Sequence, residues 1–179
     1  MIARCLSYGG YHAVHIPTDK DEDVKIYLRM RDDHKQDLKK TKQRISAFCL
    51  SQGFHYSSGK WTQAHLKWLK SLELSGLDRE TLNEYLITYE YQTNRIEAFD
   101  KRIEELASET EYVEKVKKLV CFLGVKTHTA LSCLVETGDF QRFAKGNIYS
   151  AYLGLVPGED SSSDNIKRLS ITKAGNSHV

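Results

Sequence analysis

The chain has 179 residues, which is enough for one domain of ordinary size or two small ones. Hydrophobic residues make up 40% and charged residues 28%, a balance that excludes a disordered chain. The net charge is only +2, so a basic surface for nucleic acid must be local. No apolar run is long enough for a signal peptide or a membrane span, so we expect a cytoplasmic protein with no membrane partner.

The cysteines give no sign of a metal centre. Cys5, Cys49, Cys121 and Cys133 lie far apart and form no Cys-x-x-Cys pair, which argues against a zinc site and against a disulfide framework. We expect all four to be reduced and to lie in the core. We predict no metal ligands in this chain.

A first long helix is predicted from Pro17 to near Gly53. Thr18 can cap its amino terminus, and acidic residues follow in the first turn. Residues at spacings of three and four form a heptad-like seam, which polar members weaken. The members of this seam are Val24, Tyr27, Arg31, His34, Leu38, Thr41, Ile45 and Phe48.

A second, shorter helix is predicted from about Thr62 to Ser75, with Gly76 ending it. Trp61 and Trp68 have two interpretations. They stack on nucleic-acid bases, or they pack between helices, and packing is favoured.

The third and longest helix is predicted to begin at Asp78. Its seam is the strongest periodic signal in the chain, with charged residues between the seam positions. The seam comprises Leu82, Leu86, Tyr89, Thr93, Ile96, Phe99, Ile103 and Leu106. We expect a coiled coil with the first helix, with a partner chain or with both, and therefore a homo-oligomer.

The segment from Val113 to Val135 reads as a helix, a glycine turn and a second helix. This order resembles a helix–hairpin–helix, in which hairpin amides and a helix amino terminus bind phosphate without reading bases. Gly124 and Ala130 fit the motif, whereas Lys126 occupies the place of its second glycine. An ordinary helical hairpin is an equally good interpretation.

The last quarter of the chain is the most informative stretch. An apolar helix ends at Gly154, and Pro157 prevents its continuation. Three serines follow, and the basic residues Lys167, Arg168 and Lys173 surround a short apolar segment, Leu169 to Ile171. Serine hydroxyls beside cations at a surface suit phosphoryl chemistry on nucleic acid. By composition alone, a serine-rich turn is the more common explanation.

Two longer motifs occur in this stretch, Tyr-Leu-Gly-Leu-Val-Pro from Tyr152 to Pro157 and Ile-Thr-Lys-Ala-Gly-Asn from Ile171 to Asn176. They resemble the Leu-Gly-Leu-x-Pro and Ile-Thr-Lys-x-Gly-Asn motifs of Piv-like bacterial insertion-sequence transposases. Farther upstream, Thr129 and Ala130 match this family's Thr-Ala step. The family's Gly-Asp-x-x-x-Phe is matched by Gly138, Asp139 and Phe143.

The resemblance implies that Ser162 is a nucleophile that forms a covalent phosphoserine link to DNA. Ser163 stands where the family has glycine. It also implies a nucleic-acid surface formed by Gly124, Lys126, Thr129, Lys167, Arg168, Lys173 and Asn176. In the family, magnesium is held by the carboxylates of an acidic RuvC-like domain. That domain would precede Met1, so we expect a truncated member that has no cofactor of its own. Some family members also use a guide RNA.

Together these observations predict a mainly α fold in three parts. Residues 1–16 would be the end of the acidic domain, residues 17–110 a helical coiled-coil region, and residues 111–179 an incomplete, small helical transposase domain with a helix–hairpin–helix-like element. The implied function is DNA transposition in the bacterial cytoplasm, associated with the nucleoid. A non-catalytic coiled-coil remnant that binds nucleic acid is the alternative, and a helical scaffold with no nucleic-acid role is a third.

Overall fold

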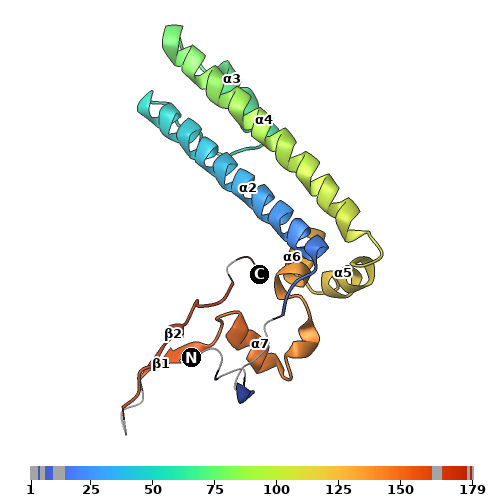
Figure 1. The fold of residues 1–179 in the computed structure, drawn as a ribbon. Coiled ribbons are helices and arrows are strands. Elements are labelled where there is room, and N and C mark those ends of the chain that lie inside the picture. The colour runs from blue at the N-terminus through green and yellow to red at the C-terminus, as the bar shows by residue number, and fades with distance from the viewer. Residues whose placement is uncertain (1–3, 5–6, 10–14, 163–166, 177, 179) are drawn as a thin grey trace. The chain divides into compact units, whose positions relative to one another are not determined.

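The computed structural model describes residues 4, 7–9, 15–162, 167–176 and 178, and it is mainly helical, as predicted (Figure 1). The elements are α2 (Asp19–Ser51), α3 (Gln63–Ser71), α4 (Gly76–Ala107), α5 (Val113–Val120), α6 (Thr127–Thr137), the 3-10 helix η1 (Phe140–Arg142), α7 (Gly146–Tyr152), β1 (Pro157–Glu159) and β2 (Arg168–Ile171). Two compact units share α2 and α4. The middle unit is Met30–Arg102, and the terminal unit combines Met1–Arg29 with Ile103–Val179. No helix of the described residues is long and apolar enough to cross a membrane.

The middle unit has its own apolar core, to which α2, α3 and α4 all contribute. The buried residues of this core are Ile45, Cys49, Leu69, Leu72, Leu82, Leu86 and Tyr89. The members of both predicted seams are buried or half-buried along α2 and α4, so the periodic patterns identified the packed faces correctly. Supercoiling and pairing with another chain stay predictions.

Two predicted helix boundaries in the middle unit were wrong. Helix α3 ends at Ser71 rather than Ser75, because Leu72 adopts an extended conformation (φ −58°, ψ 136°). Leu72 nevertheless stays buried, so leaving the helix exposes no apolar surface there. Gly76 opens α4 instead of ending α3. The prediction that Trp61 and Trp68 pack is supported, because both are partly buried against this core.

The core of the terminal unit joins both ends of the chain. Its buried residues are Val24, Leu28, Ile103, Ala107, Tyr112, Val116, Ala130, Leu131, Leu134 and Val135. The predicted cap is present, since the Thr18 hydroxyl accepts the Asp21 amide at 3.1 Å and donates to its carboxylate at 2.8 Å. The Tyr112 hydroxyl also donates to Asp21, at 2.7 Å. The start of α2 is thereby fixed to the segment that follows α4.

The region after α6 shows what the Gly-Asp-x-x-x-Phe motif does structurally. Gly138 ends α6 at a positive φ of 70°, which an L-residue seldom adopts. The Asp139 carboxylate then caps η1 by accepting the amide of Gln141 at 2.8 Å. Phe143 packs against Tyr149 and Tyr152 of α7, with ring centroids 5.0 Å and 5.2 Å away. The motif therefore turns the chain from α6 to α7.

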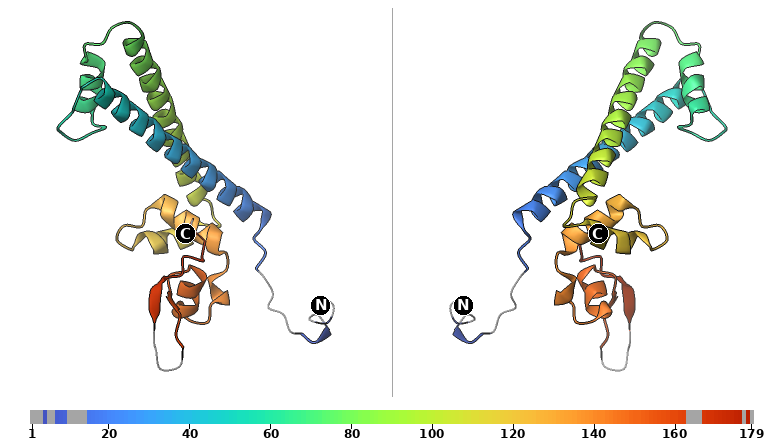
Figure 2. Two further views of the ribbon diagram at one scale, coloured as in Figure 1. Left: turned by 90° about the vertical axis from the view of Figure 1, so that its left-hand side faces the viewer. Right: turned by 90° about the vertical axis from the view of Figure 1, so that its right-hand side faces the viewer.

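The last part of the terminal unit departs from the predicted helical domain, because it ends in a two-stranded antiparallel hairpin. Pro157 pairs with Ile171 and Glu159 with Arg168, with an irregularity between the two pairs. Figure 2 shows this hairpin extending away from α5 and α6. Strands of three and four residues are too short to show the alternation that predicts a strand.

The cysteine prediction was wrong in part. Cys49 is buried and Cys133 is half-buried, but Cys121 is exposed, and Cys5 lies outside the described residues. Cys121 follows the last turn of α5, and its thiol contacts the carbonyl of Lys117 at 3.3 Å. The apolar residues next to Cys121 in the sequence suggested burial, but the residue lies on the exposed side of the chain after α5.

Candidate functional site

Ser161 and Ser162 lie beyond β1 on the terminal unit's hairpin, and both are exposed. Across the hairpin, the Asp160 amide donates to the Lys167 carbonyl at 2.9 Å, and the Lys167 amide donates to the Ser161 hydroxyl at 3.1 Å. These two bonds fix the backbone immediately before Ser162. The surface position that the sequence predicted for the serines is therefore confirmed for this pair, whereas Ser163 lies outside the described residues.

Positive charge collects on the returning side of the hairpin. Lys167, Arg168 and Lys173 are all exposed. The Lys167 ammonium lies 3.7 Å from the Asp160 carboxylate, with both side chains mostly in solvent, so this pair stabilises the fold very little. The cations therefore stay available to an anionic partner.

The base of the hairpin is joined closely to the end of α7. The Lys173 amide donates to the Gly154 carbonyl at 3.1 Å, and the Thr172 amide donates to the Val156 carbonyl at 3.0 Å. A Cβ on Gly154 would lie 2.5 Å from the backbone nitrogen of Gly175, and one on Gly175 would overlap the Leu153 carbonyl. The two segments that carry the family resemblance thus form one tightly packed joint that admits only glycine.

Helices α5 and α6 are joined by a short turn and contact each other, an arrangement that fits both predictions for this segment, a helix–hairpin–helix and an ordinary helical hairpin. Gly124 provides the turn with a positive φ of 88°. Lys126 precedes the helix in an extended conformation, and the first intrahelical amide donation is from Ala130 to the Lys126 carbonyl at 2.9 Å. The amide groups of the first turn of α6 therefore face the turn, where they suit an anion. Lys126 and Thr129 are exposed beside them.

Asn176, predicted to contact nucleic acid, has its amide engaged inside the protein. It donates to a carboxylate oxygen of Glu136 at 2.6 Å. Glu136 also forms a two-bonded ion pair with Arg29, with both hydrogen bonds 2.8 Å long. The structure therefore assembles the predicted residues into two exposed groups, one on the serine hairpin and one at the α5–α6 turn, while Asn176 contacts Glu136 of α6.

Residues 111–179 match the model of the Transposase IS116/IS110/IS902 family. The matched region contains the α5–α6 turn, the Gly-Asp turn, α7 and the serine hairpin.

Three relatives extend the similarity beyond that region. The transposase for insertion sequence element IS1533 of Leptospira borgpetersenii is 37% identical over 73% of this chain and 38% of its own length. The transposase y4qE of Sinorhizobium fredii is 31% identical over 99% of this chain and 43% of its own length. The transposase for insertion sequence element IS1111A of Coxiella burnetii is 28% identical over 98% of this chain and 48% of its own length. The chain thus resembles insertion-sequence transposases while spanning less than half of each.

Sequence reasoning missed Glu136 and Arg29. Glu136 is the one acidic residue of α6, a helix that is otherwise mostly buried, and its side chain is only 3% exposed. A carboxylate inside a mainly apolar run is the signal that would have pointed to it, because such a group needs a buried partner. The partner Arg29 could not be found from spacing, since it lies far away in the sequence.

Proposed function

We propose that this chain serves an insertion-sequence transposase by binding DNA and by cleaving and rejoining its strands through Ser162. One observation carries the proposal most directly. The transposase match spans the stretch in which an exposed serine lies at the end of a hairpin, beside exposed cations. A serine placed at a surface for turn formation alone would need neither the cations nor the closely packed hairpin base.

The chemistry is a phosphoryl transfer. The Ser162 hydroxyl oxygen attacks the phosphorus of a phosphodiester and loses its proton, while the bond from phosphorus to one sugar oxygen breaks and that oxygen gains a proton. The product is a phosphoserine diester and a free sugar hydroxyl. Attack by another sugar hydroxyl reverses the step, so the energy of the phosphodiester bond is retained for rejoining.

Lys167 and Arg168 support this step by position. Both side chains are exposed, Lys167 immediately before β2 and Arg168 as its first residue. A cation close to the attacked phosphate lowers the barrier by neutralising charge that spreads over its oxygens in the transition state. The hydrogen bond from the Lys167 amide to Ser161 keeps these side chains in register with the serine.

In this proposal, the α5–α6 turn and the hairpin together bind the DNA. The amino terminus of α6 offers backbone amides to a phosphate, and Lys126 adds a positive charge at the same place. Contacts of this type recognise the DNA backbone and do not read sequence.

In this proposal, the carboxylates of an acidic RuvC-like domain would hold magnesium. The ion would neutralise charge at the attacked phosphate. In the described parts of this chain, no three His, Cys, Asp or Glu side chains are grouped so as to hold a metal ion. We therefore assign no step of the reaction in this chain to a metal.

A chimera tests the role of the serine. This chain replaces the matching region of the Sinorhizobium fredii transposase, and the chimera is incubated with supercoiled plasmid and magnesium, then trapped with denaturant. We expect nicked DNA with covalently attached protein, lost in Ser162→Ala but still formed, at a lower rate, in Ser161→Ala, which keeps the nucleophile and loses only the acceptor of the Lys167 amide. An adduct that survives Ser162→Ala would show that Ser162 is not the nucleophile. DNA binding without any adduct, while the parent protein forms one, would favour the non-catalytic alternative.

A further inference from the structure

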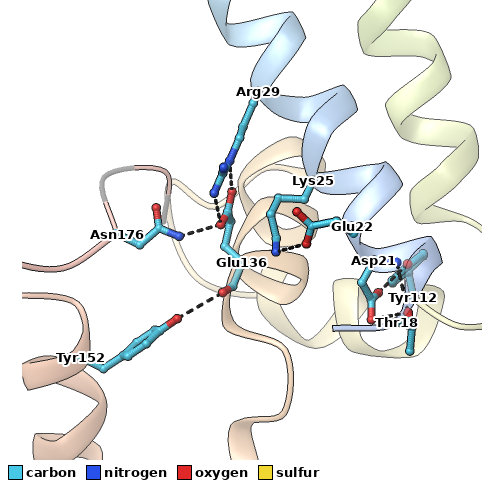
Figure 3. A network of polar contacts seen from close by, with 9 residues as sticks. All are labelled: Thr18, Asp21, Glu22, Lys25, Arg29, Tyr112, Glu136, Tyr152 and Asn176. Carbon is cyan, nitrogen blue, oxygen red and sulfur yellow. Dashed lines mark hydrogen bonds and ion pairs between the residues drawn. The ribbon is translucent and has the colours of Figure 1, made fainter. Parts of the chain in front are cut away.

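The buried carboxylate of Glu136 joins parts of the terminal unit that are far apart in the sequence. Figure 3 shows it between Arg29 of α2 and Asn176 near the carboxy terminus. Arg29 donates to both carboxylate oxygens at 2.8 Å, and Asn176 donates to one of them at 2.6 Å. The backbone carbonyl of Glu136 also accepts the hydroxyl of Tyr152, in α7, at 3.4 Å. One residue of α6 thus contacts α2, α7 and the end of the chain.

The charge at this position is stable because its partners compensate for its burial. The Glu136 side chain is 3% exposed, whereas that of Arg29 is 42% exposed. Burial alone would raise the pKa of Glu136, but hydrogen bonds from Arg29 and Asn176, with the charges of Arg29 and Lys25, hold its pKa below the ordinary value. The carboxylate is therefore ionised at neutral pH and uses both oxygens.

Asn176 directly follows Gly175, which packs at the base of the serine hairpin. Gly175 lies against the Leu153–Gly154 backbone with no room for a side chain. From there, the Lys173 amide bonds to Gly154 and the Thr172 amide to Val156, and β1 begins at the next residue. Movement of Asn176 would therefore be transmitted to the segment that carries Ser162.

We propose that Glu136 is a positioning residue for strand transfer. Held by Arg29, its carboxylate fixes Asn176 and so sets where the hairpin presents Ser162. The catalytic part of this inference rests on the proposed function, because it takes Ser162 to be the nucleophile. The mechanical part, which links Glu136 to the hairpin through Asn176, stands on contacts alone and has its own test.

The mechanical link is tested by amide hydrogen exchange on this chain, measured by NMR. Asn176→Ala is the informative variant, because at the edge of the fold it removes the donor to Glu136, together with the acceptor of the neighbouring His178 amide. Loss of a hydrogen bond to a buried charge should speed exchange of the Thr172 and Lys173 amides by about tenfold or more. The control is Asn147→Ala, in which an exposed asparagine of α7 is replaced.

Two results of the exchange experiment would overturn the link. Unchanged exchange at Thr172 and Lys173 would show that Asn176 does not hold the hairpin. Equally faster exchange at Leu134 and Val135, in the core, would show that the contact supports the whole unit and does not position the hairpin.

The catalytic part is tested in the chimera described above, using Glu136→Gln and Asn176→Ala. Both should lower the rate of covalent adduct formation at least about tenfold, a larger effect than any change in the DNA dissociation constant, because the cations of the hairpin are kept and only its position is loosened. An unchanged adduct rate despite faster hairpin exchange would contradict a positioning role. If Ser162→Ala retains the adduct while the exchange result holds, then the proposed function fails and the mechanical link stands.

Discussion

At the scale of single residues, Gly154 and Gly175 determine how the hairpin joins α7. Gly154 has a φ of 68°, and each glycine lies where a Cβ would press on backbone atoms of the other segment. Backbone atoms cannot rotate away as the end of a long side chain can. A methyl group at either position must therefore push the two segments apart.

We accordingly expect Gly154→Ala and Gly175→Ala each to destabilise the terminal unit by about 1–3 kcal/mol, the usual cost of overpacking. Gly158→Ala is the matched control within β1, because a Cβ there would lie 3.5 Å from the Cβ of Leu169, an ordinary contact. Chemical denaturation followed by circular dichroism measures the difference. Equal stability of the three variants would contradict the close packing of this joint.

At the scale of elements, α4 is a two-sided helix whose faces differ sharply in exposure. Phe99 is 6% exposed and lies 5.0 Å from the ring of His34, whereas Ile87 on the same helix is 59% exposed. The heptad pattern separated these faces correctly, because burial along a helix follows its 3.6-residue period. The partner of each face is not encoded by that period, so the pattern could not distinguish pairing within the chain from pairing between chains.

We expect Ile96→Asp combined with Phe99→Asp to lower the helical content and the thermal stability of the middle unit. A carboxylate at Phe99, which is 6% exposed, would lose most of its hydration, and the Arg95 guanidinium 4.7 Å from the ring would offset only part of that cost. Ile87→Asp is the control, since its side chain is already in solvent. Circular dichroism and sedimentation velocity give the readouts. Unaltered helicity and sedimentation in the double variant would mean that this face does not pack.

At the scale of the whole molecule, the sequence predicted the helices and the exposed serine pair, because periodicity and turn residues report on local structure. It did not predict the hairpin, since its strands are too short to show alternation. The ion pair of Glu136 with Arg29 and the contact between Gly154 and Gly175 also escaped prediction. Each depends on residues brought together only by the fold, and neither leaves a periodic trace in the sequence.

DNA binding is also a property of the whole molecule, because net charge +2 leaves the local arrangement of cations to decide it. We expect affinity for duplex DNA to fall steeply with salt and to depend little on sequence. Replacing Lys167, Arg168 and Lys173 together by alanine should reduce the slope of log K against log salt by roughly 2–3. Fluorescence anisotropy at several salt concentrations measures this slope.

The matched control removes three positive charges from the middle unit instead of the hairpin. Lys35, Lys39 and Lys67 are exposed in the middle unit, and their joint replacement by alanine should leave the slope nearly unchanged. A slope that responds equally to both triple variants would remove the hairpin from the DNA-binding surface.

The division of the chain into units has a consequence for its synthesis on the ribosome. The middle unit is continuous in sequence, so its residues emerge together. Val24 and Leu28, in contrast, share their core with Ala130 and Leu131, which are made much later. Until then this core lacks part of its buried side chains, and incompletely covered apolar surfaces attract chaperones or other nascent chains. The core around the first residues of α2 is therefore completed only when the last third of the protein has been translated.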